Sequence, residues 1–324
     1  MSLRARLAFA ALLAGAALAA SAMTPEYPAH SVKLIVADAR KSAADLVARV
    51  LAVEVAKTLK RPVVVENRPG GAGRLAAQAV ARARPDGYTL LFAPNAVFTI
   101  EPHAHPTTAF DALRDLEPVI AVGNAPFFVA VPRGMTVNSA PELIGNARLR
   151  AGGMRYTTPV PGSMQRVAAE ALANLAGFRW QHVPGTTAAQ AAKDLAANHV
   201  QVYVDILPVI QPIADAEKAK ILAVTSEKRY PSLPDVVSIG EVIPGWTEVS
   251  IVQGVFAPRS TPEAIVARWN ADVNLAIATR PVLKQLFLSG FMPAGGTPGD
   301  LEARLVRERE DVGRIAKAAG IVTR

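Results

Sequence analysis

Residues 61–92 constrain the fold most, because they contain a complete succession of strand, turn, helix, turn and strand. Residues 62–65 are rich in β-branched valine, and residues 88–92 form an apolar run typical of a buried strand. The loop at 67–73 contains three glycines, and the alanine-rich segment 75–83 favours a helix. Two strands joined by a helix predict a parallel sheet covered by helices, which is an α/β fold.

The size and composition of the chain predict two lobes with hydrophobic cores. The chain has 324 residues, of which 51% are hydrophobic and 19% are charged. These proportions argue against an intrinsically disordered chain and against a coiled coil. The sequence contains no cysteine, which excludes disulfides, thiolate metal sites, a cysteine nucleophile and a lipid-modified N-terminal cysteine. We therefore expect packing alone to hold the fold together.

The formal net charge of the chain is +8 at pH 7. The lysines and arginines are scattered along the sequence and form no stripe interleaved with aromatic residues. We therefore expect a basic, solvated surface and no nucleic-acid partner. A positive field also favours the capture of small anions.

The first 22 residues have the pattern of an export signal. Arg4 and Arg6 precede an apolar stretch at residues 7–20, and Ala-Ser-Ala at residues 20–22 fits a signal peptidase site. The alternative, a membrane anchor, needs roughly 20 apolar residues, and this stretch is shorter and ends in small residues. The sequence therefore predicts a cleaved signal peptide at residues 1–22 and a periplasmic protein.

Several motifs resemble one family of solute-binding proteins. They are Glu-Asn-Arg-Pro-Gly-Gly-Ala-Gly at 66–73, Pro-Asp-Gly-Tyr-Thr-Leu-Leu at 85–91, His-Val-Pro at 182–184, Asp205, Leu-Ala-Val-Thr-Ser at 222–226 and Phe-Ala-Pro at 256–258. Together they are similar to the binding proteins of tripartite tricarboxylate transporters, known as the Bordetella uptake gene family. The resemblance covers nearly the whole chain after the signal, and it is specific for the family but not for a ligand.

The resemblance implies a two-lobed periplasmic binding protein fold, type II-like, in which each lobe is a doubly wound sheet with flanking helices. We expect residues 23–124 plus 253–324 to form the first lobe and residues 125–252 the second. The implied function is capture of a small organic carboxylate between the lobes for the membrane permease of a tripartite transporter. We expect a monomer without a metal, a cofactor or catalytic residues.

The first predicted ligand loop follows the strand at residues 32–37. It consists of Asp38, Ala39, Arg40, Lys41 and Ser42. Ser42 and Asp45 fit a helix-capping pattern, which would explain both residues structurally. The functional alternative is that this loop binds an anion at the carboxyl end of a strand. The family typically has a proline-rich loop with two glycines here, so either charged side chains hold the ligand or the site has changed purpose.

The remaining predicted ligand residues lie in loops at other strand ends and on the strand that returns to the first lobe. They are Asn95, Ala96, Thr157, Thr158, Gly162, Ser163, Asp205 and Gln253. Asn95 has a second interpretation as a turn residue, and Asp205 has one as a cap on the turn at Leu207 and Pro208. Prolines at 159 and 161 remove amide donors from a loop that is normally glycine-rich in the family.

Two other functional classes remain open at this point. The altered loops would also fit a sensory or repurposed binder whose ligand is not a simple dicarboxylate. An enzyme could use Asp38, Asp205 and His182 as acid and base groups, but no motif unites them and the sequence lacks G-x-S-x-G. We expect His182 to be a packed histidine at a strand end, and we expect no enzymatic activity.

Overall fold

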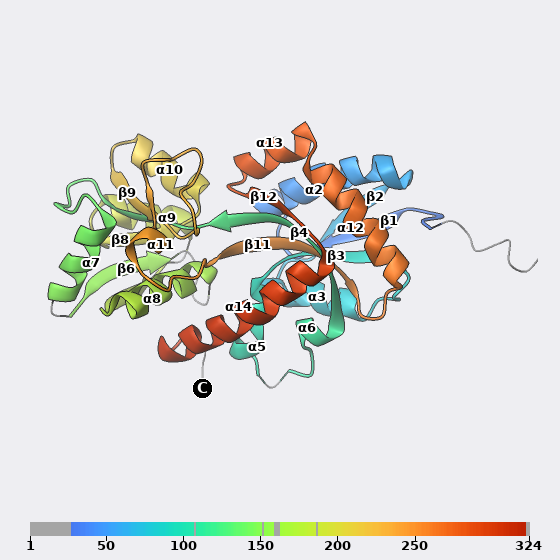
Figure 1. Cartoon of the computed structure of the whole chain (residues 1–324), viewed down its shortest axis with the longest axis horizontal. Coiled ribbons are helices and arrows are strands. Elements are labelled where there is room, and N and C mark those ends of the chain that lie inside the picture. The colour runs from blue at the N-terminus through green and yellow to red at the C-terminus, as the bar shows by residue number, and fades with distance from the viewer. Residues whose placement is uncertain (1–26, 107, 151, 159–162, 186, 322–324) are drawn as a thin grey trace, which may run out of the picture.

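The computed structural model describes residues 27–321, except residues 107, 151, 159–162 and 186. The predicted signal peptide at 1–22 and the predicted ligand residue Gly162 lie outside the described residues. In Figure 1 the chain forms two bodies side by side, each built around a six-stranded sheet with flanking helices. This architecture confirms the α/β, two-lobed fold class expected from the sequence.

The first sheet contains both strands of the unit at residues 61–92. In spatial order its strands are β12 (Met292–Gly295), β4 (Leu116–Pro126), β11 (Ser250–Pro258), β3 (Thr89–Pro94), β1 (Val32–Val36) and β2 (Val63–Asn67). Strand β1 pairs in parallel with β2 and β3, so that Leu34 lies opposite both Val65 and Leu90. The parallel arrangement predicted for that unit is therefore confirmed.

The second sheet contains both parallel and antiparallel pairs of strands. In spatial order its strands are β10 (Val237–Ser238), β9 (Ala219–Val224), β5 (Phe128–Pro132), β8 (Val202–Asp205), β6 (Met154–Thr158) and β7 (Trp180–Pro184). Strand β6 runs parallel to β7 and β8, whereas β5 runs antiparallel to β8 and β9.

Helices connect the strands and cover the faces of both sheets. They are α2 (Ala43–Leu59), α3 (Arg74–Ala81), α4 (Ala96–Thr99), α5 (Glu101–Ala104), α6 (Ala112–Asp115), α7 (Ala140–Leu149), α8 (Met164–Ala176), α9 (Ala188–Ala196), α10 (Leu207–Asp215), α11 (Ile239–Val242), α12 (Glu263–Ile277), α13 (Arg280–Leu288) and α14 (Pro298–Ala318), with a 3₁₀ turn at Gly71–Gly73. In Figure 1 helix α14 runs from the first body towards the lower side of the second, and it packs against α8 of the second body.

The central strands of each sheet are buried on both faces, which explains why they are mostly apolar. Successive residues of a strand point to opposite faces. Leu34 therefore packs with the cluster around α2 and α12, and Ile35 packs with the cluster around α3 and α14. In the second sheet Val129 faces the α7 and α8 side, while Ala130 faces the α9 and α10 side. Near-continuous apolar strands are the expected result of two covered faces.

The glycine-rich loop before α3 fits only because one position lacks a side chain. Gly73 has φ +95°, and a Cβ atom there would lie 2.7 Å from the Val97 side chain and 3.3 Å from that of Ala37. The left-handed backbone and the close approach both require glycine. The start of α3 is thereby held against the ends of β1 and β3.

Side-chain hydrogen bonds cap the first turn of many of the helices. Ser42 accepts a hydrogen bond from the Asp45 amide at 3.1 Å, which confirms the predicted cap of α2. Thr297 and Asp300 form a reciprocal capping box at the start of α14. Helix α12 has no side-chain cap, because its N-cap is Pro262 and the Thr261 hydroxyl donates to the Pro258 carbonyl.

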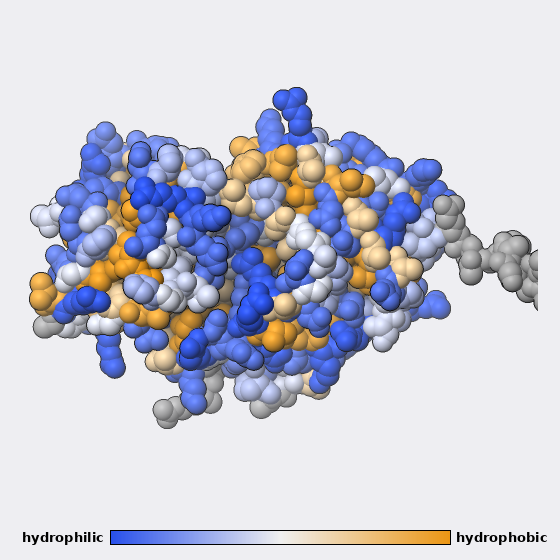
Figure 2. Space-filling model, in the orientation of Figure 1, coloured by the Kyte–Doolittle hydropathy of each residue, from blue (hydrophilic) through white to orange (hydrophobic). Residues whose placement is uncertain are grey.

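The surface is mostly hydrophilic on the face shown in Figure 2, with hydrophobic side chains gathered over the region of α12 and α13. Leu275, Phe287 and Leu288 are exposed on these two helices. Among the described helices, none is both long enough and apolar enough to cross a membrane.

We expect T297A to lower the free energy of unfolding by about 1 kcal/mol, the usual loss when an N-cap hydroxyl is removed. Urea unfolding followed by circular dichroism would measure the change. The control is T136A, at an exposed loop residue. Equal losses in both variants would show that the capping box does not stabilise α14.

Candidate functional site

The loop after β1 is held rigid by one buried carboxylate. Asp45 is 2% exposed and accepts hydrogen bonds from the Lys41 amide at 2.8 Å, from Arg49 Nε at 3.0 Å and from Asn67 Nδ2 at 2.9 Å. Burial raises the pKa of Asp45, but these hydrogen bonds outweigh it and leave the pKa below its usual value. Lys41 adopts φ +68°, a left-handed conformation that the Asp45 contact supports.

The loop points its two basic side chains outward. Asp38, Ala39, Arg40 and Lys41 are exposed, and the Asp38 carboxylate accepts a hydrogen bond from the Ala39 amide at 2.8 Å. Within the described part of the chain, the side chains of Arg40 and Lys41 form neither an ion pair nor a hydrogen bond. Two uncommitted cations at a strand end and a helix start can attract an anion.

Asn95 lies at the carboxyl end of β3 and is 1% exposed. Its Nδ2 donates to the Ser250 carbonyl at 3.1 Å and to Glu308 Oε2 at 2.8 Å, and its Oδ1 accepts from the Val252 amide at 3.2 Å. The amide of Asn95 therefore joins β3, β11 and α14. Ala96, the next residue, starts α4 and packs against the core of the second sheet.

Gln253 is buried on β11 at an irregularity in the pairing with β4. Its Oε1 is inaccessible to solvent and has no hydrogen-bond partner within the described chain. A buried acceptor without a partner is costly, so this oxygen favours a donor such as a ligand hydroxyl or a water.

The threonines at the end of β6 tie it to the edge strand β7. Thr157 Oγ1 donates to the Val183 carbonyl at 2.9 Å, and Thr158 Oγ1 lies 3.0 Å from His182 Nε2. Burial and the charge of Arg166 lower the pKa of His182 to about 4, so the ring is neutral at pH 7. His182 is the middle residue of β7 and is half-buried, so the expected position at a strand end is wrong.

Asp205 ends β8 and is the acceptor of three hydrogen bonds. Its donors are the Tyr203 hydroxyl at 2.5 Å, Gln165 Nε2 at 3.1 Å and the Ile206 amide at 2.8 Å. Asp205 is 2% exposed, and burial raises its pKa despite these donors. The carboxylate therefore positions the start of α8, where Ser163 caps the helix, relative to the end of β8.

Helices α4 and α8, which follow the predicted residues Asn95 and Ser163, approach each other. The Thr99 hydroxyl of α4 lies 3.8 Å from the sulfur of Met164, the first residue of α8. Asp38, Asp205 and His182 form no hydrogen bonds with one another in the described chain, and each has other partners. The geometry therefore gives no support to a shared acid and base centre.

Sequence reasoning missed two partners of Asp205. Tyr203 could have been found, because residues two apart on a strand face the same side. Gln165 could not, because it lies 40 positions from Asp205 and only the packing of α8 brings it there.

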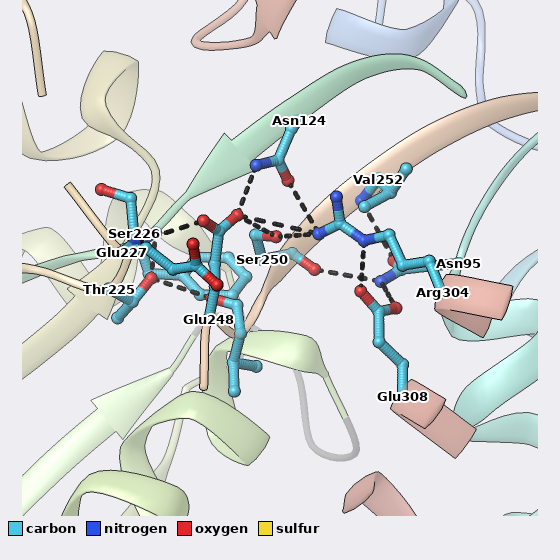
Figure 3. Close-up of polar contacts among 12 residues, drawn as sticks. Asn95, Asn124, Thr225, Ser226, Glu227, Glu248, Ser250, Val252, Arg304 and Glu308 are labelled. Carbon is cyan, nitrogen blue, oxygen red and sulfur yellow. Dashed lines mark hydrogen bonds and ion pairs between the residues drawn. The ribbon is translucent and has the colours of Figure 1, made fainter. Parts of the chain in front are cut away.

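A polar network surrounds the point where β4 and β11 pass between the bodies (Figure 3). Glu248 accepts hydrogen bonds from Asn124 Nδ2 and from Ser250 Oγ, the latter at 3.0 Å. Arg304 of α14 pairs with Glu308 at 2.6 Å and donates to Ser250 Oγ at 3.0 Å. These contacts link the crossing strands to α14.

Two six-stranded α/β bodies joined by crossing strands form the architecture of the periplasmic binding protein fold. The family model described as "Tripartite tricarboxylate transporter family receptor" matches residues 47–321. The chain belongs to this family.

Relatives agree with this assignment. The chain is 32% identical over 310 residues to a UPF0065 protein of Bordetella bronchiseptica, covering 96% of this chain and 91% of the relative. It is similar to the Rhodopseudomonas palustris protein Rpa4515, solved with adipate, at 30% identity and TM-score 0.75, covering 91% and 99% of the two chains. MatC of R. palustris, solved with bound malate, is 27% identical with TM-score 0.71 and coverage of 89% and 99%.

We expect D205A to lower the free energy of unfolding by about 2 kcal/mol, because three donors lose a buried acceptor. Denaturant unfolding would measure the loss. D38A removes an exposed carboxylate and serves as the control, with a change within about 0.5 kcal/mol. Equal stability of D205A and the unmodified protein would show that the Asp205 contacts contribute nothing net.

We expect acidification to destabilise the protein through His182, whose folded-state pKa of about 4 lies below its ordinary value of 6.5. The unfolded chain binds this proton first, so the stabilisation is complete above pH 6.5 and is lost as the pH falls towards 4. H182Q should therefore lose about 2 kcal/mol less than the unmodified protein between pH 7 and pH 5. Denaturant unfolding at both pH values measures this difference, and parallel losses would contradict it.

Proposed function

We propose that this protein captures a small organic carboxylate between its two bodies and presents it to the permease of a tripartite tricarboxylate transporter. The observation that carries the proposal is the similarity, over 91% of this chain, to a protein solved with adipate. The malate-bound relative supports the same ligand class. The loops at the strand ends would then determine which carboxylate binds, and these loops differ from those typical of the family.

Several groups can recognise the carboxylate. Arg40 and Lys41 supply positive charge beside the start of α2, and Ser163 lies at the start of α8, where amide groups favour an anion. Gln253 Oε1 is an acceptor without a partner in the described residues, and it suits a hydroxyl on the ligand. Asn95 and Asp205 act by positioning the loops, because their polar atoms already bond within the protein.

Binding would use closure of the two bodies about β4 and β11. We propose residues 23–124 plus 253–324 as one moving body and residues 125–252 as the other. A ligand that contacts both favours the closed form by the difference in its affinity for the two forms. The permease then distinguishes loaded from empty protein by shape. Export to the periplasm through the 1–22 signal, and a monomeric state, complete the proposal.

A second candidate is a sensory or repurposed binder of a ligand that is not a simple dicarboxylate. The observation in its favour is the loop at 38–42, where exposed cationic side chains replace the glycines typical of the family. The same fold and closure would serve this function, and the ligand class separates the two candidates.

A thermal-shift screen would test the proposal. The panel contains mono-, di- and tricarboxylates, aromatic acids, amino acids and amides. A ligand that binds the native state must raise the apparent melting temperature when its concentration greatly exceeds the Kd. A selective rise with one acid class supports carboxylate capture. A rise in melting temperature with amides alone, or no rise with any of the acids, would overturn the proposal.

The variant R40Q/K41Q neutralises the exposed basic pair. We expect it to lower the affinity for the carboxylate found in the screen by about tenfold and to reduce the salt dependence of the Kd. Isothermal titration calorimetry at two salt concentrations measures both changes. The matched control is R82Q/R84Q, which removes the same charge beyond α3, at the opposite strand end of the sheet. Equal effects of the two pairs would mean that Arg40 and Lys41 act only through net charge.

A further inference from the structure

Helix α14 is packed against both bodies. In its first half Leu301 and Leu305 are buried in the cluster that contains α3 and one face of the first sheet. In its second half Val312 is 3% exposed and belongs to the core of the second body, against which Ile315 also packs. The helix has 21 residues and is therefore about 30 Å long. One unbroken helix thus runs from one hydrophobic core to the other (Figure 1).

The second half of α14 is held firmly by the first body. Arg309 donates two hydrogen bonds to the Asp111 carboxylate, at 2.9 and 2.7 Å, and the Arg309 carbonyl lies 3.0 Å from His103 Nε2. Gly313 lies four residues further on, on the same face of the helix. A Cβ atom there would lie 2.5 Å from the His103 ring, so glycine allows α14 and α5 to approach closely.

The contact of the same turns with the second body is apolar and small. Val312 and Ile315 join the cluster that contains Ala168 and Leu172 of α8. We call this contact the α8 seam. The hydrogen bond between α14 and α8 nearest to it, from Arg166 to the Ala319 carbonyl, is long at 3.5 Å. The attachment to the second body is therefore the weaker of the two.

Two pockets flank the α8 seam along the helix. One of about 170 Å³ lies towards the crossing strands, between Ala171 of α8 and Glu308 of α14. The other, of about 420 Å³, lies towards the C-terminal end, between Ala173 of α8 and Ala318 of α14. Ile315 lines both. Close-packed interiors leave few such spaces, so the seam has room to slip and forfeits few contacts when it does.

Movement of the two bodies must strain one end of α14. The paired strands β4 and β11 can bend, which changes how α8 lies relative to the first body. The length of α14 is fixed by its backbone hydrogen bonds, so the helix cannot follow both bodies. The contact that gives way first is the weaker one, at the α8 seam.

We propose that α14 is a strap that restrains the two bodies, and that its α8 seam slips when they move about β4 and β11. The use of this strap in binding rests on the proposed capture of a ligand between the bodies. A ligand that favours another arrangement of the bodies would have to overcome the restraint. The restraint itself belongs to the empty protein and is measured without a ligand.

The test measures distances between spin labels by double electron–electron resonance. The chain contains no cysteine, so labels attach only at introduced sites. L149C on α7 and L275C on α12 put one label on each body, at side chains that are 88% and 62% exposed. V312S/I315S removes the apolar contact with α8. It should raise the population outside the main distance by about tenfold or more.

A third label identifies the contact that slips. R307C lies on an exposed position of α14. In I315S, the distances between labels at 307 and 149, in the second body, should broaden. The distances between labels at 307 and 275, in the first body, should stay narrow. Equal broadening of both sets would contradict slippage at the α8 seam.

The matched control is V306S, which removes a 44% exposed side chain from the same helix and should leave all distances unchanged. Circular dichroism checks that each variant is folded. If V312S/I315S does not fold, I315S alone decides, because Ile315 is only partly buried. Distances between labels at 149 and 275 that match those of the parent in the seam variants would overturn the proposal. Failure to find a carboxylate ligand would leave this result intact.

Discussion

The pairing of β4 with β11 is the constraint on which the rest of the structure depends. The two strands run antiparallel from the pair Leu116 and Pro258 to the pair Pro126 and Ser250. Beyond Pro126 the chain continues almost at once into β5 of the second sheet, so two paired strands connect the bodies in Figure 1. A connection of two hydrogen-bonded strands fixes the direction in which the bodies face each other and still allows bending.

Buried and half-buried polar groups surround this connection and give it a defined geometry. Glu248 and Arg304 approach within 3.7 Å, and Asn95 bonds to Glu308 of the same helix (Figure 3). Charges removed from water contribute little net stability, because desolvation offsets their attraction. Their value is directional, since each group has its best partners in one arrangement of β4, β11 and α14. Such a network can define the position of the bodies from which closure begins.

Sequence reasoning located the elements because their signals are local. The strand, loop, helix and strand of residues 61–92 follow from β-branched residues, glycines and alanines in order, and Ser42 marks the start of a helix. It could not assign the roles of polar residues at strand ends. Asn95 had two local interpretations, but the partners of its amide are Ser250 and Glu308, which lie 155 and 213 positions away.

The amino-acid sequence by itself determined the α/β class, the helix starts, the family resemblance and the loops that follow the strands, because these depend on neighbours in the chain. The tertiary structure decided which polar atoms have hydrogen-bond partners within the protein and which do not. Asp205 is bonded by Tyr203 and Gln165, whereas Gln253 Oε1 and Trp180 Nε1 lack partners in the described residues. Hydrogen-bond satisfaction depends on groups brought together from distant parts of the chain, so only the packed fold can reveal it.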